Sequence, residues 1–129
     1  MIYRLAKPTD FGDIAEYLVN VNYFNVPDVS SIGGIWIIAR DSSGKIRGTI
    51  WFFGGQKNMF ADYWSADIPS VAGKLCQILY SLARDEKIER IHGIVSQDNP
   101  VANKFLVSGI GVYSAGPYNR IYKEVASNG

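Results

Sequence analysis

Residues 59–112 read MFADYWSADIPSVAGKLCQILYSLARDEKIERIHGIVSQDNPVANKFLVSGIGV, and this stretch decides the fold. Its pattern predicts a strand over 59–65, a short loop, a helix over about 69–86 and a strand over 90–96. Pro100 is expected to open another short helix. A strand that leads into a helix N-terminus creates an anion site, because unpaired backbone N–H groups and the helix dipole point at whatever lies there.

The remaining segments predict further strands and one more helix. The additional strands are expected over 2–6, 35–40, 45–53, 112–114 and 118–125. Thr9 is a good N-cap for a helix that carries Ile14 and Leu18 on one face and Asp10 in its first turn. The segment 20–34, rich in Asn, Ser, Pro and Gly, is expected to be a loop.

In chain order these elements give β-α-β-β-β-α-β-α-β-β. A right-handed crossover through the helix at 69–86 would place the strand at 59–65 parallel to the strand at 90–96. The sequence therefore predicts an α/β fold whose sheet is mixed, with antiparallel hairpins of the α+β type beside the parallel crossover. The whole chain, residues 1–129, is expected to form a single domain.

Composition limits the class of protein. The chain has 129 residues, of which 47% are hydrophobic, and its net charge is +1. Such a chain folds around a packed core. Its nearly neutral charge does not indicate binding to nucleic acid or to an anionic membrane. The single cysteine, Cys76, excludes an internal disulfide and a cysteine metal cluster, and is expected to be a small buried hydrophobe. No apolar run is long enough to span a membrane and no signal-peptide pattern is present, so a cytoplasmic protein is expected.

Four segments together resemble the GNAT acyltransferase superfamily, whose members move an acyl group from coenzyme A to an amine. The segment 3–11 resembles the first strand and helix entry, and 35–48 the hairpin of the second and third strands. The segment 59–86 lies where the fourth strand, the pyrophosphate loop and the long helix belong. Asn99-Pro100-Val101-Ala102 resembles the Asn-x-x-Ala motif. The resemblance implies an acyl-CoA N-acyltransferase fold and an N-acetyltransferase that uses acetyl-CoA and an amine acceptor.

The resemblance also implies which residues form the site. Asp62, on the strand where many members carry a carboxylate, would be the general base, acting directly or through water. Tyr113 or water would protonate the departing thiolate. The residues that would bind the cosubstrate are Tyr63, Trp64, Ser70, Val71, Ala72, Gly73, Lys74 and Asn99. The acceptor pocket would be built from loops such as 20–34, and no metal is implied.

Two departures from the family pattern leave an alternative open. The family's loop pattern, Gln/Arg-x-x-Gly-x-Gly/Ala, can be aligned here in two registers, with Gly73 as its last or as its first small residue. In each register, two of the three defined positions of the pattern carry a different residue. Leu106 stands seven residues after Asn99, where the family often has the Tyr that acts as acid. Small divergent GNAT-like proteins occur in bacteriophages, some associated with the virion. The alternative is thus a catalytically inactive binding or structural protein, in a host cytoplasm or a virion; an unrelated α+β binding domain is a third.

Several side chains that could have a functional role can also be explained by a structural one. His92, the single histidine, is expected to be a hydrogen-bonded strand residue rather than a base. Asp67 or Ile68 is expected at the N-cap of the helix over 69–86, and Asn99 is expected to cap the helix that follows it. The aromatic residues of the three central strands are expected mostly in the core. An exposed remainder would bind a partner subunit, giving a homodimer, or another protein.

Overall fold

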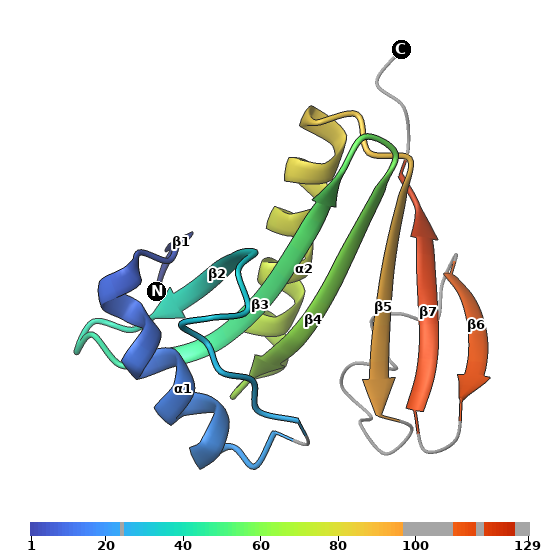
Figure 1. The fold of residues 1–129 in the computed structure, drawn as a ribbon. Helices are drawn as coiled ribbons and strands as arrows, with labels where there is room; N and C mark the ends of the chain where they lie inside the picture. Colours follow the sequence, from blue (N-terminus) through green and yellow to red (C-terminus); the bar gives the residue numbers. More distant parts are fainter. Residues whose placement is uncertain (24, 97–109, 116–117, 126–129) are drawn as a thin grey trace.

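The computed structural model describes residues 1–23, 25–96, 110–115 and 118–125, which contain one seven-stranded mixed sheet (Figure 1). The strands are β1 (Ile2–Leu5), β2 (Ile35–Arg40), β3 (Ile46–Gly55), β4 (Asn58–Ala66), β5 (Arg90–Ser96), β6 (Ile110–Ala115) and β7 (Tyr118–Glu124). Their order across the sheet is β1-β2-β3-β4-β5-β7-β6. A 3₁₀ turn, η1 (Pro8–Asp10), leads into α1 (Phe11–Asn20), and α2 (Pro69–Asp85) connects β4 to β5.

The strand and helix predictions are confirmed wherever the structure describes the chain. β4 and β5 are parallel, as the crossover predicted, and every other neighbouring pair is antiparallel. The hairpin between β3 and β4 is longer than predicted, because Gly54 stays paired with Met59 at a φ of +130° that suits glycine. The helix predicted to begin at Pro100 lies outside the described residues. No helix in the described part of the chain is long and apolar enough to cross a membrane.

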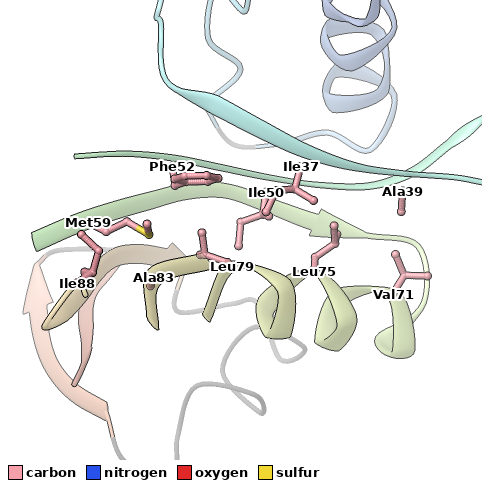
Figure 2. Packing of buried hydrophobic residues seen from close by; sticks show 10 residues of the cluster. All are labelled: Ile37, Ala39, Ile50, Phe52, Met59, Val71, Leu75, Leu79, Ala83 and Ile88. Atoms are coloured by element: carbon pink, nitrogen blue, oxygen red, sulfur yellow. The ribbon is translucent and has the colours of Figure 1, made fainter. Parts of the chain in front are cut away.

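The two helices cover opposite faces of the sheet. Figure 2 shows Leu75 and Leu79 of α2 pointing toward Ile50 and Phe52 of β3, within the larger of two apolar clusters. On the other face, Ile14 and Leu18 of α1 pack in a second cluster with Trp36, Ile38 and Trp51. Alternation along β2 and β3 sends successive side chains to the two clusters. The sheet therefore has an α2 face and an α1 face.

Gly48 of β3 lets α2 approach the sheet closely. A Cβ added there would lie 2.8 Å from Val71 Cγ1 and 2.9 Å from Leu75 Cδ1. Gly48→Ala is therefore expected to lower the free energy of unfolding by about 1–3 kcal/mol, measured by urea denaturation. The control is Gly12→Ala in α1, where the added Cβ has nothing within 4 Å and should leave stability unchanged or raised. Equal stability of the two variants would contradict this account.

Asp10 has a structural role that the sequence pattern did not reveal. It is 4% exposed and its carboxylate accepts hydrogen bonds from both terminal nitrogens of Arg4 at 2.7 and 2.8 Å and from Arg40 at 2.8 Å. The Arg4 guanidinium holds the pKa of Asp10 well below its usual range. Asp10 also accepts a hydrogen bond from the Lys7 backbone N–H at 2.7 Å. The prediction of Thr9 as N-cap is wrong, because Thr9 lies inside η1 and Asp10 is the N-cap of α1.

Candidate active site

Asp62 lies at an irregularity in β4. Trp51 of β3 faces Asp62, whereas Thr49, two residues earlier, faces Ser65. One extra residue is therefore inserted in β4 between Asp62 and Ser65, which is a β-bulge. Bulges re-aim side chains and are common beside active sites.

Tyr63 is the residue of the bulge whose backbone conformation is strained. Its φ is +52°, a left-handed conformation that is costly for a residue with a side chain. Two hydrogen bonds hold it there: the Tyr63 N–H donates to Asp62 Oδ1 at 2.7 Å, and its carbonyl accepts from the buried Thr49 hydroxyl at 2.9 Å. The bulge is thus fixed from both sides, which positions the Asp62 carboxylate.

The surroundings of Asp62 suit a general base. Burial raises the pKa of the Asp62 carboxyl, while the Tyr63 N–H and the Tyr23 hydroxyl act in the opposite direction by stabilising the carboxylate. The Tyr23 hydroxyl donates to Oδ1 at 3.2 Å. Within the described residues, both of these hydrogen bonds end on Oδ1, so Oδ2 remains for a substrate. A carboxylate with a raised pKa takes up a proton more readily at neutral pH.

Tyr23 is a site residue that the sequence did not predict. It lies in the loop between α1 and β2, 39 residues before its partner Asp62. Its ring centroid lies 5.7 Å from that of Tyr63. Burial raises the pKa of the Tyr23 hydroxyl, so this group stays protonated and donates to the carboxylate. Spacing along the chain carries no signal for such a contact; only the general expectation that loop 20–34 borders the acceptor pocket points to it.

Next to Asp62 the two parallel strands separate. β4 and β5 pair from Asn58↔Arg90 to Ala61↔Gly93, and within the described residues this pairing goes no further. Figure 1 shows β4 and β5 diverging toward their C-terminal ends. Backbone groups of β4 beyond Ala61 therefore face a widening gap in the sheet rather than β5. Such groups can pair with an extended ligand, as an added strand would.

The N-terminus of α2 follows directly on this part of β4. Ser70 and Lys74 are exposed there, and the first turn contains no acidic residue, so the positive end of the helix dipole is not neutralised. Of the two residues predicted for the N-cap of α2, Ile68 takes that position, and the Asp67 carboxylate pairs with Arg47 instead. An anionic ligand is thus compatible with this helix end.

Other predicted cosubstrate residues have structural roles. Val71 and Ala72 are buried under the sheet, and their N–H groups donate to the Ile68 carbonyl at 3.1 and 3.2 Å. Gly73 is the fifth residue of α2. Trp64 points to the α2 face, where its indole N–H donates to the Ala72 carbonyl at 3.0 Å. Trp64 therefore ties the bulged end of β4 to the first turns of α2.

The remaining predicted residues lie away from Asp62 or cannot be placed. Tyr113 is on β6, which β7 and β5 separate from β4 and Asp62. Asn99 lies outside the described residues. His92 Nε2 is 3.0 Å from Asn58 Oδ1, in agreement with its prediction as a hydrogen-bonded strand residue. Among the described residues no cluster of three or more His, Cys, Asp or Glu side chains could hold a metal ion.

Comparison with known proteins supports the architecture. No protein-family model and no curated protein matches the chain. An acetyltransferase of the GNAT family from Staphylococcus aureus Mu50 matches with a TM-score of 0.80 at 15% identity, over 97% of this chain and 100% of that one. Aminoglycoside 6'-acetyltransferase type Ii matches with a TM-score of 0.76 at 14% identity, over 100% of each chain. Tetrahymena GCN5 matches with 0.75 at 9% identity, over 98% of this chain and 97% of that one.

These matches extend over nearly the whole of each chain, including the helix that follows the fourth strand. At such low identities they establish the architecture alone. The chain has the fold of the GNAT acyl-CoA N-acyltransferases, as the order of its strands and helices predicted.

Proposed function

We propose that the protein is an N-acetyltransferase that moves an acetyl group from acetyl-CoA to an amine. One observation carries the proposal: the parallel strands β4 and β5 separate at the point where a bulge in β4 positions the half-buried Asp62 carboxylate. A thioester held in this gap would lie beside a base. The match to solved acetyltransferases agrees with this assignment.

The two faces of the sheet separate the two substrates. The N-terminus of α2, with Ser70 and Lys74, would bind the diphosphate of coenzyme A on the α2 face. The pantetheine arm would pass through the gap beside Tyr63 and Trp64, hydrogen-bonded to the main chain of β4. Asp62 lies on the other face, because it is opposite Trp51 and accepts a hydrogen bond from Tyr23. The amine would therefore approach from the α1 face.

The chemistry then needs a base on the amine and an acid on the sulfur. The amine nitrogen attacks the thioester carbonyl carbon, a C–N bond forms, and the C–S bond breaks to release coenzyme A as a thiolate. Asp62 Oδ2 takes the proton that the nitrogen loses, directly or through one water. Water returns a proton to the thiolate, because β5 and β7 separate Tyr113 on β6 from β4. Tyr23 and the Tyr63 N–H hold the carboxylate in place through Oδ1.

A non-catalytic binding protein with this fold is the second candidate, and one observation favours it. The Val71 and Ala72 N–H groups are both used by the Ile68 carbonyl, and Pro69 has no N–H to offer. Fewer backbone donors are then left for a diphosphate than a glycine-rich loop provides. The two candidates differ in whether acetyl-CoA binds.

Acetyl-CoA is expected to stabilise the protein against heat. At 100 times its dissociation constant, the ligand should add about 2.7 kcal/mol to the free energy of unfolding, which a thermal melt at increasing acetyl-CoA measures. Lys74→Glu places a negative charge at the N-terminus of α2 and should reduce this stabilisation. Lys87→Glu, beyond the other end of the same helix, should leave it intact. No stabilisation at millimolar acetyl-CoA would reject the enzyme and favour the binding protein.

A further inference from the structure

A continuous chain of aromatic rings begins beside Asp62 and extends along the α1 face of the sheet. From ring to ring the centroids are 5.7, 5.6, 5.0, 5.3 and 5.1 Å apart. In order, the rings belong to Tyr23, Tyr63, Trp51, Phe53, Phe60 and His92. The chain begins at the residue that bonds Asp62 and continues across β3, β4 and β5. These six residues form the aromatic strip.

The outer part of the aromatic strip is exposed. Phe53 is 48% exposed and Phe60 is 41% exposed, although they stack on each other in the middle of the sheet. Phe60 precedes Asp62 by two residues on the same face of β4, a distance of roughly 7 Å along the strand. An exposed apolar surface adjoining a half-buried carboxylate is the arrangement of a ligand site that binds an apolar body and one polar group.

The charges near the aromatic strip limit the ligand further. Asp62 is the single acidic residue of β3, β4 and β5. Arg90 and His92 alternate with Ile91 along β5, so both are on the side of the sheet that carries the aromatic strip. One carboxylate on these strands therefore satisfies one ammonium group.

Resting on the proposed function, we propose that the acceptor is a primary amine with a single positive charge joined by a short linker to an aromatic ring. The ammonium group binds Asp62 Oδ2, and the ring covers Phe53 and Phe60. The amine group then lies at the gap between β4 and β5. Polyamines, lysine-rich peptides and other polycations are excluded as preferred acceptors, because their additional charges have no acidic partner on these strands.

The test compares three amines by calorimetric binding and by acetyl transfer from acetyl-CoA. The three are 2-phenylethylamine, ethylamine and spermidine. We expect 2-phenylethylamine to bind at least about tenfold more tightly than ethylamine, because its ring buries apolar surface, and its kcat/KM to be higher by a similar factor. Phe60→Ala should remove most of this preference by raising the KM for 2-phenylethylamine. Leu5→Ala, which truncates another exposed apolar residue on distant β1, is the control and should change neither the preference nor the KM.

The outcomes separate this inference from the proposed function. Binding of 2-phenylethylamine that depends on Phe60, with no acetyl transfer to any amine, would reject the transferase and keep the amine site. Transfer to all three amines with equal kcat/KM would keep the transferase and overturn the inference. A preference for spermidine, or no binding of 2-phenylethylamine, would also overturn it.

Discussion

Asp62→Asn is expected to lower turnover by about 10²–10⁴-fold, the usual contribution of a general base. The amide cannot take up the proton that the attacking nitrogen loses. It keeps the shape of the side chain, and its oxygen can still accept the Tyr63 N–H that holds Asp62 Oδ1 at 2.7 Å. Steady-state kinetics with acetyl-CoA and an amine measure the loss in kcat. Acetyl-CoA should bind as before, since the proposed diphosphate site is at α2.

The pH dependence of turnover gives a second readout of the same variant. Burial raises the pKa of Asp62, and the ionised form is the base, so turnover should rise with pH through that raised value. The pH profile of Asp62→Asn should lack the rise that comes from ionisation of Asp62. It should keep only the rise that comes from deprotonation of the amine substrate. Because the folded protein favours protonated Asp62, its contribution to stability is present below its ordinary pKa and lost as pH rises through the raised one. The variant should therefore be at least as stable at neutral pH.

Asp85→Asn is the matched control for this experiment. Asp85 is exposed at the last residue of α2 and should tolerate the same substitution with unchanged kcat. A turnover of Asp62→Asn within a factor of two of the wild type would remove Asp62 from the mechanism. Equal losses in both variants would point to a general effect of the substitution rather than to a base.

The sequence predicts most of the fold because the signals are local. Alternation in 35–53 and helical spacing over 69–86 each identify an element from its own residues, and turn residues such as Gly44 mark the boundary between strands. The register is then set by which face must be buried. The same logic failed at Thr9, because Asp10 is engaged by arginines from two strands and this tertiary contact overrides the local capping preference.

The candidate site is only partly predictable for the same reason. Resemblance to a family gave the position of Asp62 on its strand. Its partners come from distant segments. Tyr23 lies 39 residues away along the chain, and Thr49 of β3 holds the bulge by a hydrogen bond to the Tyr63 carbonyl. A tyrosine in a left-handed conformation has no sequence signature, since Gly and Asn are the usual residues there. The bulge that positions the carboxylate depends on hydrogen bonds between residues of two strands.

Asp10→Ala is expected to have the largest effect on stability. Asp10 joins Arg4 of β1 and Arg40 of β2 at the entry to α1, so its removal leaves two guanidinium groups without their shared partner. The expected loss is about 3 kcal/mol in the free energy of unfolding, the low end of the range for a buried pair, because the Arg4 side chain is 36% exposed. Urea denaturation at neutral pH measures it.

Two measurements distinguish loss of the ion pair from loss of packing as the cause of the destabilisation in Asp10→Ala. They are the pH dependence of stability and the effect of removing a neighbouring carboxylate. The pKa of Asp10 is held below its ordinary value, so its contribution is fully present above that value and is lost as pH falls through the lowered one. Wild-type stability should therefore fall in acid below about pH 4, and Asp10→Ala should lack this part of the slope. Asp13→Ala, which removes a 58% exposed partner of the same Arg40, should cost well under 1 kcal/mol. If the two variants lost equal stability, or if Asp10→Ala kept the wild-type slope, Asp10 would not be the charge that fastens β1 and β2 to α1.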